Sequence, residues 1–153
     1  MSFERTLAEL GLVLPPPPKP VATYIPAVLA GELLFLSGVI PLREGTLVFE
    51  GKLGRDLTVE QGYEAARIAL LNALAIVRHE LGTLDRVKKI VRMTGHVASA
   101  EGFVQHPAVI NGASDLLVKI FGETGQHARV ALGAAELPLN APVEIELIVH
   151  VKP

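Results

Sequence analysis

The fold of this chain is decided by two stretches near its C-terminus, ARVALGAAE at residues 128–136 and VEIELIVHV at residues 143–151. In the second stretch the apolar residues from Val143 to Val151 alternate with Glu144, Glu146, Ile148 and His150. Because side chains alternate between the two faces of a β-strand, this period of two predicts a strand with one buried face. The first stretch alternates small and larger residues and predicts another strand, joined to the second by a proline-bounded turn at residues 137–142.

Two helices are predicted upstream of these strands. Thr58 and Gln61 have the spacing of a capping box, in which each side chain binds the other residue's backbone N–H. A helix of about two dozen residues is expected to follow and to end near Leu81, with Gly82 as its left-handed cap. A second helix is expected from Pro107 to Phe121, because proline suits a first helical turn.

Three further segments complete the predicted sheet. Leu33–Ile40 is expected to be a buried strand that stops at Pro41, and Arg43–Leu53 a hairpin region punctuated by glycines. Val87–Ala98 predicts a strand with Val91, Met93, Gly95 and Val97 on one face and Arg92, Thr94 and His96 on the other. The order of elements predicts an α+β fold with two helices layered on one face of the sheet.

The N-terminal part of the chain has a different character. Ser2–Leu10 predicts a short helix, and prolines at positions 15–18 and 20 then force an extended arm. We interpret this arm as a stiff connector on the surface; the alternative is a docking motif for a partner. The chain is therefore divided into an N-terminal helix with its arm, residues 1–20, and one domain, residues 21–153.

Composition narrows the classes of function. The 153 residues carry a formal net charge of −2, and the basic residues form no stripe of the kind that tracks a phosphate backbone, so a nucleic-acid partner is disfavoured. Apolar runs are too short for a membrane span, and the charged start of the chain does not resemble a secretory signal. Together with the lack of cysteine, these features predict a cytoplasmic protein.

No cofactor or metal is predicted. The five histidines show no ligand spacing, cysteine is absent, and no glycine-rich loop could cradle a phosphate. Ser37 and Ser114 lie outside the sequence context of a nucleophilic serine.

Arg129 is the residue that most suggests a binding site, since it interrupts an otherwise small and apolar strand. A guanidinium is rarely buried without an acid, and its planar fork fits a carboxylate with two hydrogen bonds. It could anchor an anionic ligand in a cleft, or it could pair with Glu144 or Glu146 on an adjoining strand. From these residues alone both interpretations stay open.

Glu144 and Glu146 share one strand face. Either could act as a general acid or base if partial burial raised its pKa, although both could equally be solvated or ion-paired. His96 and His150 could serve as a base, or could be satisfied histidines on a strand face.

Five short segments in order resemble the RidA/YjgF family, whose members are described as reactive intermediate deaminases and carry the older label L-PSP endoribonuclease. The closing signature is matched by Ala128-Arg129, Leu137-Pro138 and Val143–Glu146, and the family's early strand by Leu36-Ser37-Gly38-Val39-Ile40-Pro41. Tyr24 precedes that strand as a tyrosine often does in the family, and Val109-Ile110-Asn111 opens the second helix. The resemblance covers roughly residue 20 to the end.

The resemblance implies a chorismate-mutase-like fold, with a six-stranded mixed sheet backed by two helices and three copies assembled into a homotrimeric barrel. It implies a cleft at each subunit interface that binds a small carboxylate-bearing metabolite without a cofactor. By this resemblance Arg129 holds the substrate carboxylate, Glu144 places or protonates a water, and Tyr24, Ser37 and Asn111 line the cleft. His127, Val130 and Ala131 depart from the family pattern, which indicates a divergent branch.

The function expected first is hydrolysis of 2-imino or enamino acids to 2-oxo acids and ammonia. The alternative is a non-catalytic trimer that binds small carboxylates and regulates a partner. Ribonuclease activity is disfavoured by the charge distribution and by the absence of a paired-histidine site. Chorismate mutase activity is disfavoured because a dianionic substrate would require more than one arginine.

Overall fold

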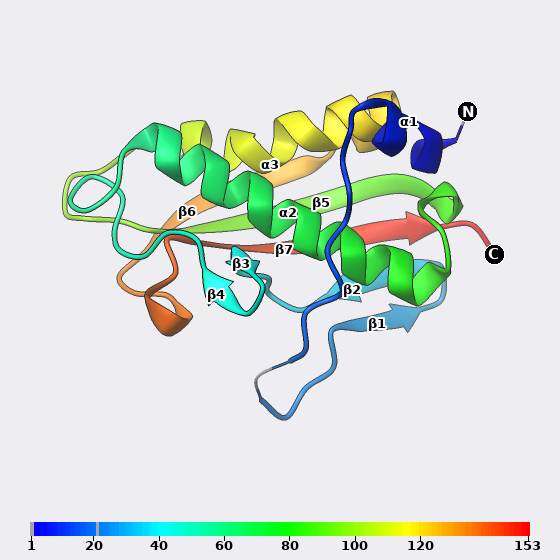
Figure 1. The fold of residues 1–153 in the computed structure, drawn as a ribbon, viewed down its shortest axis with the longest axis horizontal. Helices are drawn as coiled ribbons and strands as arrows, with labels where there is room; N and C mark the ends of the chain where they lie inside the picture. The colour runs from blue at the N-terminus through cyan, green and yellow to red at the C-terminus, as the bar shows by residue number, and fades with distance from the viewer. Residues whose placement is uncertain (1, 21) are drawn as a thin grey trace.

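Two long helices cover one face of a five-stranded sheet in the computed structural model of the protein, which describes residues 2–20 and 22–153 (Figure 1). The helices are α1 (Phe3–Glu9), α2 (Val59–Leu81) and α3 (His106–Phe121). The strands are β1 (Ala27–Ala30), β2 (Leu33–Leu36), β3 (Leu42–Arg43), β4 (Thr46–Leu47), β5 (Val87–Ala98), β6 (Ala128–Ala134) and β7 (Val143–Val151). The α+β fold expected from the order of elements is confirmed.

The main sheet has the order β1-β2-β7-β5-β6, in which only the β5–β6 pair is parallel. β3 and β4 form a separate two-stranded sheet. The expectation of one six-stranded sheet is therefore wrong: the described residues contain seven strands, five in one sheet and two in another.

The predicted strand Leu33–Ile40 stops at Leu36 because a bulge interrupts its pairing with β7. Phe35 pairs with Ile148, and the next contact is an isolated bridge between Val39 and Ile145. Four steps along one strand thus match three along the other, so one residue is left over, as in a β-bulge. Pro41 follows and cannot donate to a ladder, so the chain leaves the sheet.

A second irregularity changes which residues of β5 face the helices. Met93, Gly95 and Val97 are buried as expected, but Val91 is 37% exposed. The register shifts between Ile90 and Arg92, which inserts an extra residue and turns Ile90 into the core. The predicted placement of Val91 is therefore wrong.

The predicted helices are confirmed at their ends. The Thr58 hydroxyl accepts from the Gln61 backbone N–H at 3.2 Å, the Gln61 side chain accepts from the Thr58 N–H at 2.9 Å, and Gly82 has a φ of 82°. α3 begins one residue before the predicted Pro107. The two helices pack closely, because a Cβ at Gly112 of α3 would collide with the carbonyl of Tyr63 on α2.

The N-terminal helix packs on the core that the rest of the chain forms. Phe3 and Leu7 are buried, and the ring of Phe3 meets that of Phe121 edge to face. The arm then crosses α2 (Figure 1), and its residues Leu12 and Leu14 pack against the core.

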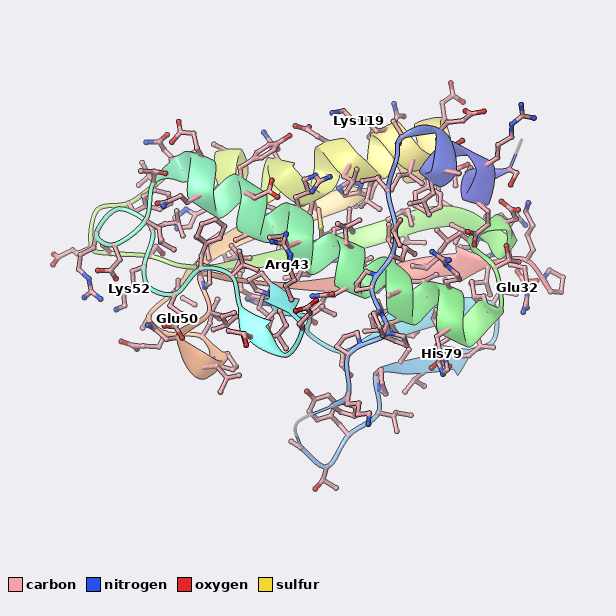
Figure 2. All side chains as sticks on the ribbon, viewed as in Figure 1. Glu32, Arg43, Glu50, Lys52, His79 and Lys119 are labelled. Carbon is pink, nitrogen blue, oxygen red and sulfur yellow. The ribbon has the colours of Figure 1, made fainter. Side chains whose placement is uncertain are left out.

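The labelled side chains of Lys119 on α3 and Glu32 in the β1–β2 turn lie at the periphery, away from this core (Figure 2). Among the described residues no helix combines the length and hydropathy needed to cross a membrane.

Candidate functional site

A cavity of about 560 Å³ lies where the arm, the bulge after β2 and the start of β7 meet. Tyr24, Ser37 and Glu144, three of the five residues expected to bind substrate, line it. The remaining lining residues are Pro18, Lys19, Pro20, Ala22, Pro26, Gly38, Val39, Ile40, Leu42, Ile76, Pro138 and Leu139.

The bulge places Glu144 against the backbone of Gly38. A Cβ built at Gly38 would lie 2.6 Å from Glu144 Oε2, so a larger residue here would force this carboxyl group to move. Burial raises the pKa of Glu144; His96 lowers it, and the neighbouring Glu146 raises it further. Across the part of the chain that the structure describes, Glu144 makes no side-chain hydrogen bond or ion pair. Its raised pKa and free oxygens suit a general acid or base.

Glu146, in contrast, is engaged by a histidine. His96 Nε2 lies 2.6 Å from Glu146 Oε2, and His96 is the cross-strand neighbour of Glu144. The two glutamates share one strand face but have different surroundings: Glu146 is paired, and Glu144 faces the cavity.

Ser37 ties the end of the arm to the bulge. Its hydroxyl donates to the carbonyl of Ile25 at 2.7 Å, and its backbone N–H donates to Pro26 at 2.9 Å. Since the hydroxyl proton is used in this way, the oxygen of Ser37 faces a ligand as an acceptor. Tyr24 lies on the same wall and is 46% exposed.

Arg129 and Asn111 meet at the far edge of the sheet. Arg129 Nη1 donates to Asn111 Oδ1 at 2.8 Å and to Ser114 Oγ at 3.1 Å. The alternative of an ion pair with Glu144 or Glu146 is wrong, because β5 lies between β6 and β7. Arg129 is also the register partner of the buried Met93, so it lies on the helix side of the sheet, opposite to the face of the two glutamates.

Sequence inspection missed a pair of residues that hold Arg129. His127 Nδ1 lies 2.6 Å from the carbonyl of Gly125, which can only accept, so this nitrogen carries the proton. His127 Nε2 therefore accepts from Ser114 Oγ at 2.9 Å, and the same oxygen accepts from Arg129. Burial lowers the pKa of His127, the hydrogen bond to Gly125 raises it, and the charge of Arg129 lowers it.

Spacing could have revealed this pair. Ser114 follows Asn111 by three residues on one helix face, and His127 precedes Arg129 by two on one strand face. Neither residue stands out by motif, because Ser114 lacks the context of a nucleophilic serine and His127 lacks the spacing of a metal ligand.

The five expected residues thus form two groups in one chain. Tyr24, Ser37 and Glu144 surround the cavity near β2, whereas Asn111 and Arg129 lie at the opposite edge of the sheet, by β6 (Figure 1). The chain by itself does not bring the guanidinium to the carboxyl group.

Comparison with known proteins adds relatives over nearly the whole chain. Residues 4–151 match the family model described as YjgF/chorismate mutase-like, a description that also carries the word endoribonuclease. Protein TCP17 of Trypanosoma cruzi is 40% identical over 145 residues, which cover 94% of this chain and 91% of that protein. A 2-iminobutanoate/2-iminopropanoate deaminase of Dermatophagoides farinae is 28% identical over 135 residues, 88% of this chain and 91% of that protein.

A solved structure has the same arrangement from end to end. An endoribonuclease-labelled protein of Shewanella oneidensis superimposes with a TM-score of 0.95 at 37% identity, covering 99% of this chain and 100% of that one. The N-terminal helix and arm are therefore shared with a relative. On the family match, the fold and these relatives, the chain belongs to the YjgF/chorismate mutase-like family, the RidA/YjgF family that its motifs resemble.

Proposed function

We propose that this protein hydrolyses reactive 2-imino or enamino acids to 2-oxo acids and ammonia, in clefts between the subunits of a homotrimer. The proposal rests on the hydrogen bonds of the Arg129 guanidinium. Its two side-chain acceptors, Asn111 and Ser114, are neutral. Among the residues that the structure describes, no acid pairs with this positive charge, so a substrate carboxylate can supply the partner. The relative named as a 2-iminobutanoate/2-iminopropanoate deaminase supports this reaction class.

Arg129 orients the substrate. One nitrogen, Nη1, makes both hydrogen bonds to the protein, which leaves Nη2 and Nε for the two oxygens of a carboxylate. Such a fork fixes the plane of the carboxylate and therefore the position of the adjacent imine carbon.

Glu144 moves the proton. As a water oxygen bonds to the imine carbon, Glu144 accepts a proton from that water and passes it to the imine nitrogen, which gives a carbinolamine with one hydroxyl and one amino group. Glu144 then accepts the hydroxyl proton and passes it to the amino nitrogen as the carbon–nitrogen bond breaks, so that ammonia leaves and the carbonyl forms. The raised pKa of Glu144 suits it to both transfers, and the oxygen of Ser37 can accept from the imine N–H. No cofactor is required because the imine carbon is already electrophilic.

The trimer is proposed because one chain cannot complete the site. The sheet face away from the helices exposes Val28, Phe35 and Leu132, at 49%, 39% and 48%, which is the kind of surface that copies of a chain cover. In the trimer that the family resemblance implies, Arg129 of one copy meets Glu144 of its neighbour. A small carboxylate-bearing metabolite is the partner, and nucleic acid is not.

The test is the release of ammonia from freshly generated 2-iminobutanoate, with wild type beside Arg129→Ala. Removing two charge-assisted hydrogen bonds is expected to lower kcat/KM by about 100-fold or more. Light scattering must show the same mass for both proteins. Full activity of Arg129→Ala would contradict the mechanism, and binding of 2-oxobutanoate without any turnover by wild type would favour a non-catalytic carboxylate-binding protein.

A further inference from the structure

We propose that the proline arm selects the substrate, so that the cavity takes 2-imino acids with a bulky apolar side chain, of leucine or phenylalanine type. This inference rests on the proposed function for its reaction, but it concerns the part of the substrate that does not react. Pro18 and Pro20 of the arm, together with Ala22 just after it, form one wall of the cavity that holds Glu144.

Four of the side chains that line the cavity carry polar groups: Lys19, Tyr24, Ser37 and Glu144. Ser37 and Glu144 are needed for the imine and the water. Most of the remaining wall is apolar and comes from separate parts of the chain, including Pro18, Pro20, Ile40, Leu42, Ile76 and Leu139. Against this apolar part of the wall, a polar substrate side chain would lose its water without gaining a partner.

The volume also exceeds what a short imino acid requires. About 560 Å³ falls in the range of roughly 300–1,000 Å³ typical of sites for drug-sized ligands. A substrate that ends in a methyl or ethyl group would leave much of this apolar wall uncovered. Each additional buried methylene is expected to improve binding about fourfold.

The arm can act as a wall because it is held at both ends. Leu12 and Leu14 pack on the core before the prolines, and Ser37 binds the carbonyls of Ile25 and Pro26 after them. Between these points the prolines have a fixed φ and no N–H to offer. At Pro18 and Pro20 the arm therefore presents stiff apolar surface and no backbone donors, with Lys19 between them.

The experiment compares kcat/KM for 2-imino acids generated from alanine, leucine, phenylalanine and aspartate. Wild type is expected to prefer the leucine and phenylalanine imines over the alanine imine by tenfold or more, and the aspartate imine tests whether Lys19 offers a partner to an acidic side chain. Equal use of all four, or a preference for the alanine imine, would overturn the inference.

Leu139→Asn tests the wall itself. Leu139 lines the cavity, is 61% exposed and has a φ of 59°, which asparagine tolerates, so the change should alter polarity without unfolding the turn. The leucine-to-alanine imine preference is expected to fall severalfold. The control Val104→Asn makes the same kind of change at a residue that is 78% exposed and does not line the cavity, and it should keep the preference. An unchanged ratio in Leu139→Asn contradicts the proposed wall.

A second measurement separates failure of the proposed reaction from failure of the proposed apolar preference. If wild type hydrolyses none of the imines, calorimetry with pyruvate and 4-methyl-2-oxopentanoate tests the cavity alone. Tenfold tighter binding of the branched acid supports the inference without the reaction; equal or weaker binding rejects it.

Discussion

Arg129 keeps its charge available because of the residues that hold it. A carboxylate partner within the chain would have neutralised it, whereas the oxygens of Asn111 and Ser114 only orient it. The neutral His127 fixes the direction of the Ser114 hydroxyl, so that the serine oxygen accepts from Arg129. We infer that these three residues position the guanidinium and do not react.

Ser114→Ala should weaken substrate binding while leaving the trimer and the protonation of the reacting groups intact. The variant removes one of the two acceptors of Arg129, and losing one hydrogen bond to a charged group costs about 1.5–3 kcal/mol, an increase in KM of about 10- to 100-fold. The increase in KM is measured by steady-state kinetics with 2-iminobutanoate. Ser99→Ala is the control, because Ser99 makes a similar contact with His106, at 3.2 Å, outside this cluster. Equal effects of the two variants would show that the loss is merely structural.

Glu144→Gln should raise stability at neutral pH and not at acid pH. Burial raises the pKa of Glu144 in the folded protein above its unfolded value, so its contribution to stability is fully present below the unfolded pKa. That contribution is lost as the pH rises through the raised folded value. The difference in Tm between variant and wild type should therefore grow between pH 4 and pH 7. A difference independent of pH would contradict the raised pKa, and Glu101→Gln, on an exposed turn, serves as the control substitution.

Among the elements, the bulge after β2 contributes most to the site. It ends the strand, turns Ser37 toward the arm and leaves Gly38 beneath Glu144. Helix α2 and the arm then cover the cavity from the other side, through Ile76 and Pro18. A regular strand would have continued past Leu36 without forming this pocket.

Gly38→Ala should displace Glu144 and destabilise the protein. The added Cβ would lie 2.6 Å from Oε2 and 2.8 Å from Cδ of Glu144, and moving this side chain out of its rotamer to relieve the contact costs about 0.5–1.5 kcal/mol. Urea unfolding measures the cost. The same substitution in a Glu144→Ala background should cost much less, because the atoms that collide are gone. An equal cost in both backgrounds would show that the backbone at Gly38, and not Glu144, requires glycine.

At the scale of the whole molecule, the two halves of the proposed site lie at different places on one chain. Arg129 lies on the helix side of the edge strand β6, and Glu144 faces the cavity near β2. In the proposed cyclic homotrimer, every interface joins the surface that carries Arg129 on one copy to the surface that carries Glu144 on the next copy. The proposed trimer therefore contains three equal sites, each with residues from two copies.

Mixed trimers test this arrangement. Arg129→Ala and Glu144→Gln should each be inactive alone, but unfolding and refolding them together in equal amounts should restore about a quarter of wild-type activity, since about one interface in four would combine the two intact residues. Activity is measured by ammonia release, and separately refolded variants that are mixed afterwards are the control. No recovery in trimers shown to be mixed would contradict a site that combines Arg129 of one copy with Glu144 of another.

Much of the fold was predictable because its signals are local. The capping box at Thr58, the glycine stop at Gly82 and the alternation in β7 depend on residues a few positions apart, and all were confirmed. The bulges at Val91 and Ser37 were not predictable in this way, because each is defined by how many residues the partner strand places opposite.

The sequence by itself determined the helices, most of the strands, the family and the unusual position of Arg129 in an apolar strand. Only the tertiary structure decided which glutamate is paired, that Ser114 and His127 hold Arg129, and that the arm walls the cavity. The physical reason is the distance along the chain over which each interaction acts. Periodicity and capping act between neighbours in the chain, whereas hydrogen-bond partners and cavity walls come from segments that strand order brings together across tens of residues.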